Sequence, residues 1–510
     1  MFRTVVSQGW FALAVVGLLA SSCLHGVAAE RAALLAAVNS ITRDEAKSVV
    51  DMLADDSFEG REAGSRGGRA AGNFLMKEME THGLVPAGDN GTYFQAFNGS
   101  SRNILGLLEG RDPRMRGEVI VIGAHYDHVG YGRVTNSFGP FGYIHNGADD
   151  NASGIAGLLE LIEAVKQLPE APRRSILFAF WDAEEQGLLG SYHWLASPTL
   201  PDRRAVVALN LDMIGRLRNT RLEVYGTRTM ANLRRIISQA NREAGLVIDF
   251  GWKMKADSDH FPFFARGIPS LMFHTGLHRD YHRPSDDAHT INPDGIATVT
   301  QVVLLAALEL AERDEAGTFR EASRREHPGL QPELEKPTAA PGPRFGIPFE
   351  IRGQPPQFVL LTPTPGYPAA RAGLRAGDRF VLLNRLPIDS EERFRLDLLA
   401  AEGETIFTIE RPGEAGPREF HVTPIGSPIR LGISWRGDDA EPQSVLLTHV
   451  VYGSAAHVAG LQHGDRIYSV GGQSFASEQQ FAQLLTTMSG PLEFEVERNG
   501  RLRPVTAQPH

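Results

Sequence analysis

Imidazole and carboxylate side chains follow an apolar run at residues 121–129, where the chain reads VIGAHYDHV. His125 and Asp127 lie two positions apart at the predicted end of a strand, so their side chains leave the same face. A neutral imidazole that binds a metal ion usually donates its other N–H to a carboxylate. His125 as a metal ligand oriented by Asp127 fits that requirement, although a surface turn would also accommodate such a pair.

A pair of adjacent aspartates, Asp149 and Asp150, follows in the sequence GADDNASG. Small residues and an apolar helix come next, so either carboxylate is placed to bind a metal ion at the start of the helix. The N-cap of a helix favours the same residue types. Spacing alone does not choose between these interpretations or between the two aspartates.

Carboxylates and a histidine also follow three later apolar segments. Glu184 and Glu185 come directly after the strand-like run RSILFAFWD, where they could supply a metal ligand and a general base or simply begin a charged helix. Asp212 ends the run AVVALNLD. His282 lies four residues before Asp286, which is either an orienting carboxylate or a turn residue. These groups together indicate a hydrolytic metal centre.

Alternating strand and helix patterns position these residues. Strands are expected at 101–109, 118–124, 174–181, 205–211, 221–225 and 268–274, and helices at 154–168, 187–196, 230–244 and 293–311. Residues 30–83 are largely helical, with a polar, Gly-rich loop at 56–68. Continuous apolar strands between helices predict the α/β class, with a mostly parallel central sheet and helices on both faces. The domain spans residues 30–313.

The N-terminal residues 1–29 have the pattern of a signal peptide: a basic residue, the apolar run WFALAVVGLLA, and small residues before Glu30. We therefore expect an exported protein, periplasmic or secreted. Cys23 is the only cysteine of the 510 residues. Lipidation at Cys23 is the alternative to cleavage after Ala29, and only then would a membrane be involved. Cleavage after Ala29 would leave no disulfide, and a metal site must then use histidine and carboxylates.

The net charge of −10 argues against a nucleic-acid partner. Residues 314–343 are charged and then Pro-rich, which is typical of a linker. Beyond it, PAARAGLRAGDR is repeated as AAHVAGLQHGDR, and Gly346 and Gly432 lie 86 positions apart. The repeat predicts two small, β-rich domains, at 344–426 and 427–508.

The motifs GAHYDHVG, GADDNASG, WDAEEQGLLGS, NLDMIG and YHRPSDD, in this order, resemble those of the co-catalytic zinc exopeptidases, which include secreted bacterial leucyl-type aminopeptidases and glutamate carboxypeptidase. The resemblance implies two zinc ions per chain and a zinc exopeptidase fold. By similarity, the metal ligands are His125 and Asp212 for one ion, Glu185 and His282 for the other, and Asp150 as the bridge. Glu184 then matches the general base, and Tyr281 matches a residue that stabilises the oxyanion.

The activity implied by the resemblance is that of a zinc metallopeptidase, and we expect an aminopeptidase that removes N-terminal residues from peptides or proteins. A carboxypeptidase of the same family is the alternative. The sequence does not distinguish them, since the residues that would bind a terminal amine or carboxylate cannot be identified. The Gly- and aromatic-rich interval 128–146 is expected to be a mobile lid, a pocket wall or a plain surface loop.

The two repeats resemble PDZ domains of bacterial periplasmic proteases, which implies that they bind C-terminal peptides through an R-apolar-G-apolar loop. The matching residues are Arg344, Phe345, Gly346 and Ile347 in the first repeat, and Arg430, Leu431, Gly432 and Ile433 in the second. Pro348 could remove a strand donor from the first repeat. A binding scaffold with a vestigial hydrolase is an alternative of another class.

Overall fold

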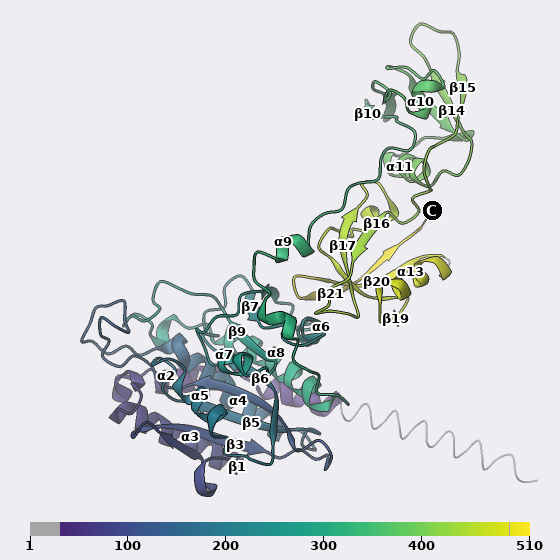
Figure 1. Ribbon diagram of the computed structural model, residues 1–510. Helices are drawn as coiled ribbons and strands as arrows, with labels where there is room; N and C mark the ends of the chain where they lie inside the picture. Colours follow the sequence, from purple (N-terminus) through teal and green to yellow (C-terminus); the bar gives the residue numbers. More distant parts are fainter. Residues whose placement is uncertain (1–30, 489, 510) are drawn as a thin grey trace, which may run out of the picture. The chain divides into compact units, whose positions relative to one another are not determined.

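The computed structural model describes residues 31–488 and 490–509. They form two compact units, and the boundary lies between Pro328 and Gly329 (Figure 1). The predicted signal peptide and Cys23 lie outside the described residues.

A nine-stranded sheet forms the centre of the first unit. Its strands are β1 (Val85–Pro86), β2 (Phe94–Phe97), β3 (Ser101–Leu108), β4 (Glu118–His125), β5 (Ser175–Trp181), β6 (Arg204–Leu211), β7 (Arg221–Tyr225), β8 (Val247–Gly251) and β9 (Ser270–His274). The order is β1-β3-β5-β4-β6-β9-β7-β8, and β2 pairs with β3. The central strands β5, β4, β6 and β9 are parallel, whereas β3 and β7 join them antiparallel. The sheet is therefore mixed, and the predicted α/β class is confirmed.

Helices cover both faces of this sheet (Figure 1). They are a helix at 31–40, α2 (Arg43–Leu53), α3 (Arg66–Thr81), α4 (Gly154–Lys166), α5 (Leu189–Ala196), α6 (Leu233–Ala240), α7 (His260–Ala265) and α8 (Pro293–Glu312). Short helical turns are η1 (Asp56–Arg61), η2 (Asp89–Gly91), η3 (Ala148–Ser153), η4 (Ala288–Thr290) and η5 (Glu321–Arg324). The long α8 is apolar enough to cross a membrane, but 72% of its apolar window is buried within the unit, as expected of a core helix.

Strand β4 shows why the apolar runs are continuous. Ile120 and Ile122 enter the core beneath α4 and α8, whereas Val119 and Val121 enter the core that contains Trp194 of α5. Successive side chains of a strand point to opposite faces, so a strand covered on both sides needs apolar residues at every position. This packing fixes the end of β4, and with it the position of His125.

The second unit contains two sheets of the same topology. The first has β10 (Phe349–Arg352), β11 (Gln357–Leu360), β12 (Arg379–Leu383), β13 (Leu386–Pro387), β14 (Thr405–Glu410) and β15 (Arg418–Val422), with α10 (Pro368–Arg371) and α11 (Glu391–Ala400). The second has β16 (Ile433–Arg436), β17 (Val445–Val450), β18 (Arg466–Val470), β19 (Gln473–Ser474), β20 (Leu492–Arg498) and β21 (Arg501–Ala507), with α12 (Ala455–Val458) and α13 (Glu478–Thr487). The strand orders β10-β11-β12-β14-β15 and β16-β17-β18-β20-β21 correspond one to one.

The segment predicted as a linker is partly structured. Phe319 packs against Phe264 of α7 at a ring distance of 5.7 Å, and Arg320 pairs with Glu326. The first unit therefore extends beyond residue 313 to Pro328. The rest of the segment includes the short helix α9 (Gln331–Leu334) in the second unit. Low hydrophobicity suggested a linker, but Phe319, together with ion pairs and hydrogen bonds such as Arg228 with Glu326, holds the segment against the core.

Candidate metal centre

Parallel strand ends bring together the histidines and carboxylates predicted from the sequence. They are His125 at the end of β4, Asp150 in η3, Glu184 and Glu185 after β5, Asp212 after β6, and Tyr281 and His282 after β9. Neighbouring parallel strands end at the same edge of a sheet, so residues far apart in the chain meet there. The polar cluster lies at this edge.

Asp150 occupies the middle of the cluster because its two carboxylate oxygens face different partners. Oδ1 lies 3.3 Å from Nε2 of His125, and that nitrogen is also 3.5 Å from Oδ1 of Asp212. Oδ2 lies 3.1 Å from Nε2 of His282, which is 3.2 Å from Oε2 of Glu185. The arrangement is two groups of ligand atoms that share one carboxylate.

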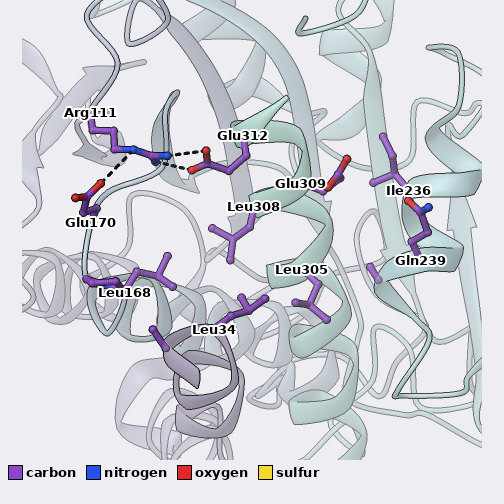
Figure 2. A pocket seen from close by; sticks show the side chains of 13 residues that line it. Leu34, Arg111, Leu168, Glu170, Ile236, Gln239, Leu305, Leu308, Glu309 and Glu312 are labelled. Carbon is purple, nitrogen blue, oxygen red and sulfur yellow. Dashed lines mark hydrogen bonds and ion pairs between the residues drawn. The ribbon is translucent and has the colours of Figure 1, made fainter. Parts of the chain in front are cut away.

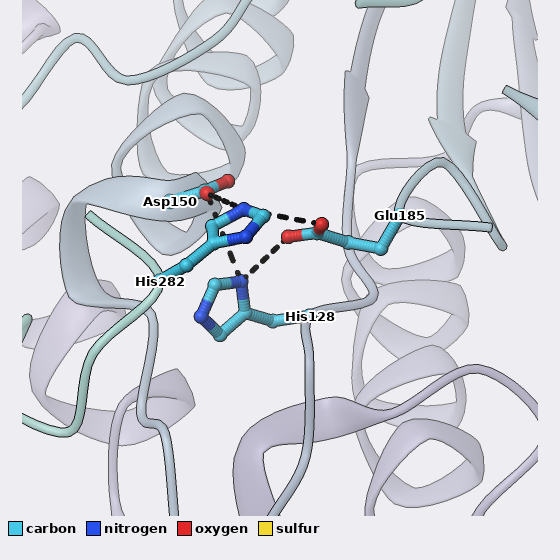
Figure 3. Close-up of side chains that lie close together, drawn as sticks. All are labelled: His128, Asp150, Glu185 and His282. Atoms are coloured by element: carbon cyan, nitrogen blue, oxygen red, sulfur yellow. Dashed lines mark hydrogen bonds and ion pairs between the residues drawn. The ribbon is translucent and has the colours of Figure 1, made fainter. Parts of the chain in front are cut away.

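The second group contains a residue that the sequence interpretation missed. Nδ1 of His128 lies 2.9 Å from Oε1 of Glu185 and 3.8 Å from Oδ2 of Asp150. Figure 3 shows the His128 ring turned toward the cluster from a different part of the chain than His282. His128 directly follows the His125-x-Asp127 pair, but it had been assigned to the interval after it. Its position three residues from His125 was the signal available in the sequence.

The described residues fit divalent cations at both groups. Among them, His125, Asp150 and Asp212 form one set and His128, Asp150, Glu185 and His282 another, with ligand atoms within 4.8 Å of one another. Nitrogen–oxygen separations near 3.3 Å are roughly those expected between two ligands of a tetrahedral zinc ion with bonds of about 2.0 Å. Oδ1 of Asp212 is buried and has no hydrogen-bond partner, which is unfavourable unless a cation or proton is bound there.

The electrostatics of the cluster favour a positive charge. Burial opposes ionisation of His125, yet the carboxylates around it raise its pKa well above the usual value. Despite burial, hydrogen bonds to Asp150 and Glu185 raise the pKa of His282 to about 10. The same contacts hold the pKa of Asp150 well below its usual value, against the effect of burial. A divalent cation bound here would take the place of protons on these groups.

Asp127 acts on the site differently from the prediction. Nδ1 of His125 lies 3.1 Å from the backbone carbonyl of Asp127, whereas the Asp127 carboxylate is 3.9 Å away. That carboxylate instead accepts the backbone N–H groups of Glu184 and Glu185, at 3.0 and 3.4 Å. His125 is thus oriented by the main chain, because the side chain of Asp127 turns toward the end of β5 and fixes the position of the two glutamates.

Asp286 also has a different partner from the one expected. Its Oδ2 accepts the backbone N–H groups of Asp149 and Asp150 at 3.0 Å each, and no hydrogen bond to His282 is found in the described part of the chain. The Asp149 carboxylate turns away to His278 and to the backbone N–H of Gly215. The hydrogen bonds of Asp149 therefore turn it away from the cluster, and Asp150 is the member of the pair that faces His125 and His282.

A cavity of about 480 Å³ opens beside the cluster and contains the other predicted catalytic residues, Glu184 and Tyr281. Burial raises the pKa of Glu184 well above the usual value. The Tyr281 ring stacks on His282 at 3.9 Å, and burial raises the pKa of its hydroxyl, so the phenol stays protonated. A carboxyl group with a raised pKa can take up and release a proton during a reaction. A protonated phenol in the same cavity can donate a hydrogen bond.

The interval 128–146 forms part of the surroundings of this site. The backbone N–H of Phe138 donates to the carbonyl of His282 at 3.1 Å, and Arg283 donates to the carbonyl of Phe138 at 2.7 Å. The Phe138 ring lies 6.1 Å from that of Tyr281. These contacts hold the interval against Tyr281 and His282, and its role as a lid or a pocket wall stays a prediction.

Arg61 anchors both ends of the interval and was not identified from the sequence. Its fully buried guanidinium donates to the carbonyl oxygens of Tyr126, Asn146 and Gly147 at 2.6–3.0 Å. Burial lowers the pKa of Arg61 to about 10, which leaves it charged at neutral pH. It therefore holds the main chain on either side of the interval next to the candidate ligands.

Another cavity, of about 660 Å³, lies near the C-terminal end of α8 (Figure 2). Leu34, Leu305 and Leu308 line it, and its charged groups are joined in ion pairs such as Arg111 with Glu312. It contains none of the grouped ligands. The chemistry therefore belongs to the smaller cavity.

Comparison with known protein families finds one matching segment in the first unit and one in the second. The model of Peptidase family M28 matches residues 103–307, which include every member of the cluster. Over this range the chain is similar to peptidase family M28. The model of the PDZ domain matches residues 420–497, in the second repeat.

Two of the curated proteins similar to this chain come from bacteria. Aminopeptidase YwaD of Bacillus subtilis is 28% identical over 250 residues, which cover 47% of this chain and 51% of the relative. Leupeptin-inactivating enzyme 1 of Streptomyces exfoliatus is 29% identical over 270 residues, or 51% and 55% of the two chains. The chain thus spans about half the length of these curated relatives. The Legionella pneumophila LapA aminopeptidase structure has 21% identity, a TM-score of 0.48, and coverage of 55% and 74%.

Proposed function

We propose that the protein is an exported aminopeptidase that uses two zinc ions to remove N-terminal residues from peptides. The observation that carries this proposal is the position of Asp150 between two groups of ligand atoms. A shared carboxylate is what a pair of closely spaced catalytic ions requires. The donor atoms are histidine nitrogens and carboxylate oxygens, which suit zinc. Zinc ions bound there would lower the pKa of a water molecule and polarise the carbonyl group of the substrate.

The residues of the cavity have separate roles in this proposal. Glu184 accepts the proton of the attacking water and returns it to the leaving amine, since it lines the cavity and its pKa is raised by burial. Tyr281, held protonated, donates a hydrogen bond to the oxygen that becomes negative during the attack. Asp127 and Asp286 keep the backbone of the ligands in place through hydrogen bonds.

The second unit is proposed to recruit substrates or partner proteins through C-terminal peptides. The loop glycines Gly346 and Gly432 both have positive φ values, of 73° and 82°, and a side chain at either would collide with Tyr367 or Ser454. A cavity of about 310 Å³ lies against the loop of the first repeat and α11. Export is proposed from residues 1–29, whose sequence has the pattern of a signal peptide.

The test is a panel of substrates together with metal analysis. We expect zinc in the purified protein and cleavage of unblocked aminoacyl-nitroanilides. Glu184→Gln should retain zinc but lose on the order of 10²–10⁴-fold in kcat, the usual contribution of a general base. Cleavage restricted to N-blocked peptides with free C-termini would instead identify a carboxypeptidase. If the protein contains no zinc and cleaves none of the substrates, the enzyme hypothesis is wrong. The PDZ binding scaffold is then the remaining interpretation.

A further inference from the structure

Two lysines, Lys253 and Lys255, line the wall of the cavity beside the candidate metal centre. They belong to the segment between β8 and α7. Both ends of this segment are fixed: Trp252 is buried and its ring lies 3.9 Å from the guanidinium of Arg228, and Ser258 donates to Oδ2 of Asp212. The lysines are thus held near the ligands by the backbone, although their side chains are exposed.

The charges of the cavity leave Lys253 available to a ligand and engage Lys255 only in part. Asp257 is 3.8 Å from Lys255, whereas no carboxylate among the described residues lies within ion-pair distance of Lys253. Glu223 is engaged by the hydroxyl of Tyr225 at 2.6 Å. The proximity of Lys255 lowers the pKa of Lys253, since two neighbouring ammonium groups repel each other. An anion bound between the two lysines would relieve this repulsion.

We propose that Lys253 and Lys255 bind a carboxylate of the substrate close to the scissile bond. Two sources have this chemistry: the free C-terminus of a dipeptide or tripeptide, and the side chain of an acidic residue. In either case the site selects small, acidic substrates over neutral ones. This inference rests on the proposed peptidase activity and adds a substrate class to it.

The experiment compares pairs of substrates that differ only in a carboxylate. Leu-Gly against Leu-Gly amide tests the C-terminus, and Glu-nitroanilide against Gln-nitroanilide tests the side chain. In the zinc-loaded wild type, we expect one of the two pairs to show a higher kcat/KM for the substrate with the carboxylate than for its neutral counterpart. The double variant Lys253→Gln/Lys255→Gln should reduce that ratio by up to about fivefold, the range for exposed charge pairs.

The matched control is Lys77→Gln/Lys166→Gln, which removes the same charge from exposed lysines outside the cavity and should leave the ratio unchanged. Raising the salt concentration should weaken the preference in the wild type. Equal cleavage of acid and amide in both pairs, or the same ratio in the lysine variant, would overturn the inference while leaving the peptidase intact. No cleavage of any unblocked substrate would overturn both proposals.

Discussion

Removing the Asp286 carboxylate should weaken metal binding although this residue is not a ligand. Asp286 is fully buried, and its Oδ2 accepts two backbone N–H groups, those of Asp149 and Asp150. In Asp286→Ala both N–H groups lose their acceptor in a buried position. A buried donor without a partner costs about 1–3 kcal/mol, so the change should destabilise the first unit by roughly 2–6 kcal/mol.

The same loss should reach the metal centre. Asp150 is the carboxylate that both ligand groups share, and its main chain would no longer be fixed. Loss of a group that orients a ligand typically reduces metal affinity by about 10–100-fold. Zinc affinity, measured by titration against a chelating dye, should fall by that factor in Asp286→Ala.

Asp286→Asn is the matched control because the amide keeps an oxygen that can accept the two N–H groups. It should retain most of the stability and most of the zinc affinity. Urea unfolding of both variants supplies the stability difference. If Asp286→Ala binds zinc as tightly as the wild type and unfolds at the same urea concentration, these hydrogen bonds do not support the site.

Three other changes have defined outcomes. Burial raises the pKa of Glu160 from its ordinary value of 4.5 to about 7, so the folded unit prefers the protonated form and stability falls as the pH rises from about 4.5 to 7. Glu160→Gln should therefore add up to about 3 kcal/mol at pH 8 and little at pH 4.5. The control Glu163→Gln removes only a neighbouring charge that raises the pKa of Glu160 less than burial does, so it should change the pH dependence of urea unfolding much less. Arg61→Met should leave buried carbonyl groups without their hydrogen-bond donor and so lower the melting temperature. Activity should be lost even at temperatures where the variant is still folded. His128→Ala should lower zinc affinity by about 10–100-fold, and unchanged affinity would exclude His128 from the site.

The position of the centre could be predicted because strand ends are visible in the sequence. An apolar run that stops at His125, or just before Asp212, marks both a buried strand and the edge of the sheet to which ligands are brought. The antiparallel pairing of the strands near the edges of the sheet was harder to predict, because hydrophobic periodicity does not specify which strands pair. Strand β8 and helix α7 are short and lack a distinctive pattern, and neither was predicted.

Contacts between distant segments could not be predicted from local patterns. Arg61 reaches carbonyl groups 65 and more positions away, and a buried arginine is too rare to expect from composition. Asp127 was expected to orient His125 because the two lie on one strand face, but its carboxylate accepts the backbone N–H of Glu184, after β5, instead. The choice depends on which main-chain donors lie nearby, and only the packed sheet determines that.

The separation between the metal centre and the lysine segment has a consequence for specificity. The candidate ligands are fixed by the sheet and by main-chain hydrogen bonds from Asp127 and Asp286. Lys253 and Lys255 instead belong to a segment that is joined to the ligand Asp212 through a hydrogen bond from Ser258. Substitutions within the segment should therefore alter the preferred substrate while zinc content stays constant. Substitution of Ser258, in contrast, should change both, because its hydroxyl donates to the ligand Asp212 directly. Zinc content and substrate ratio measured on the same preparations would separate these two kinds of effect.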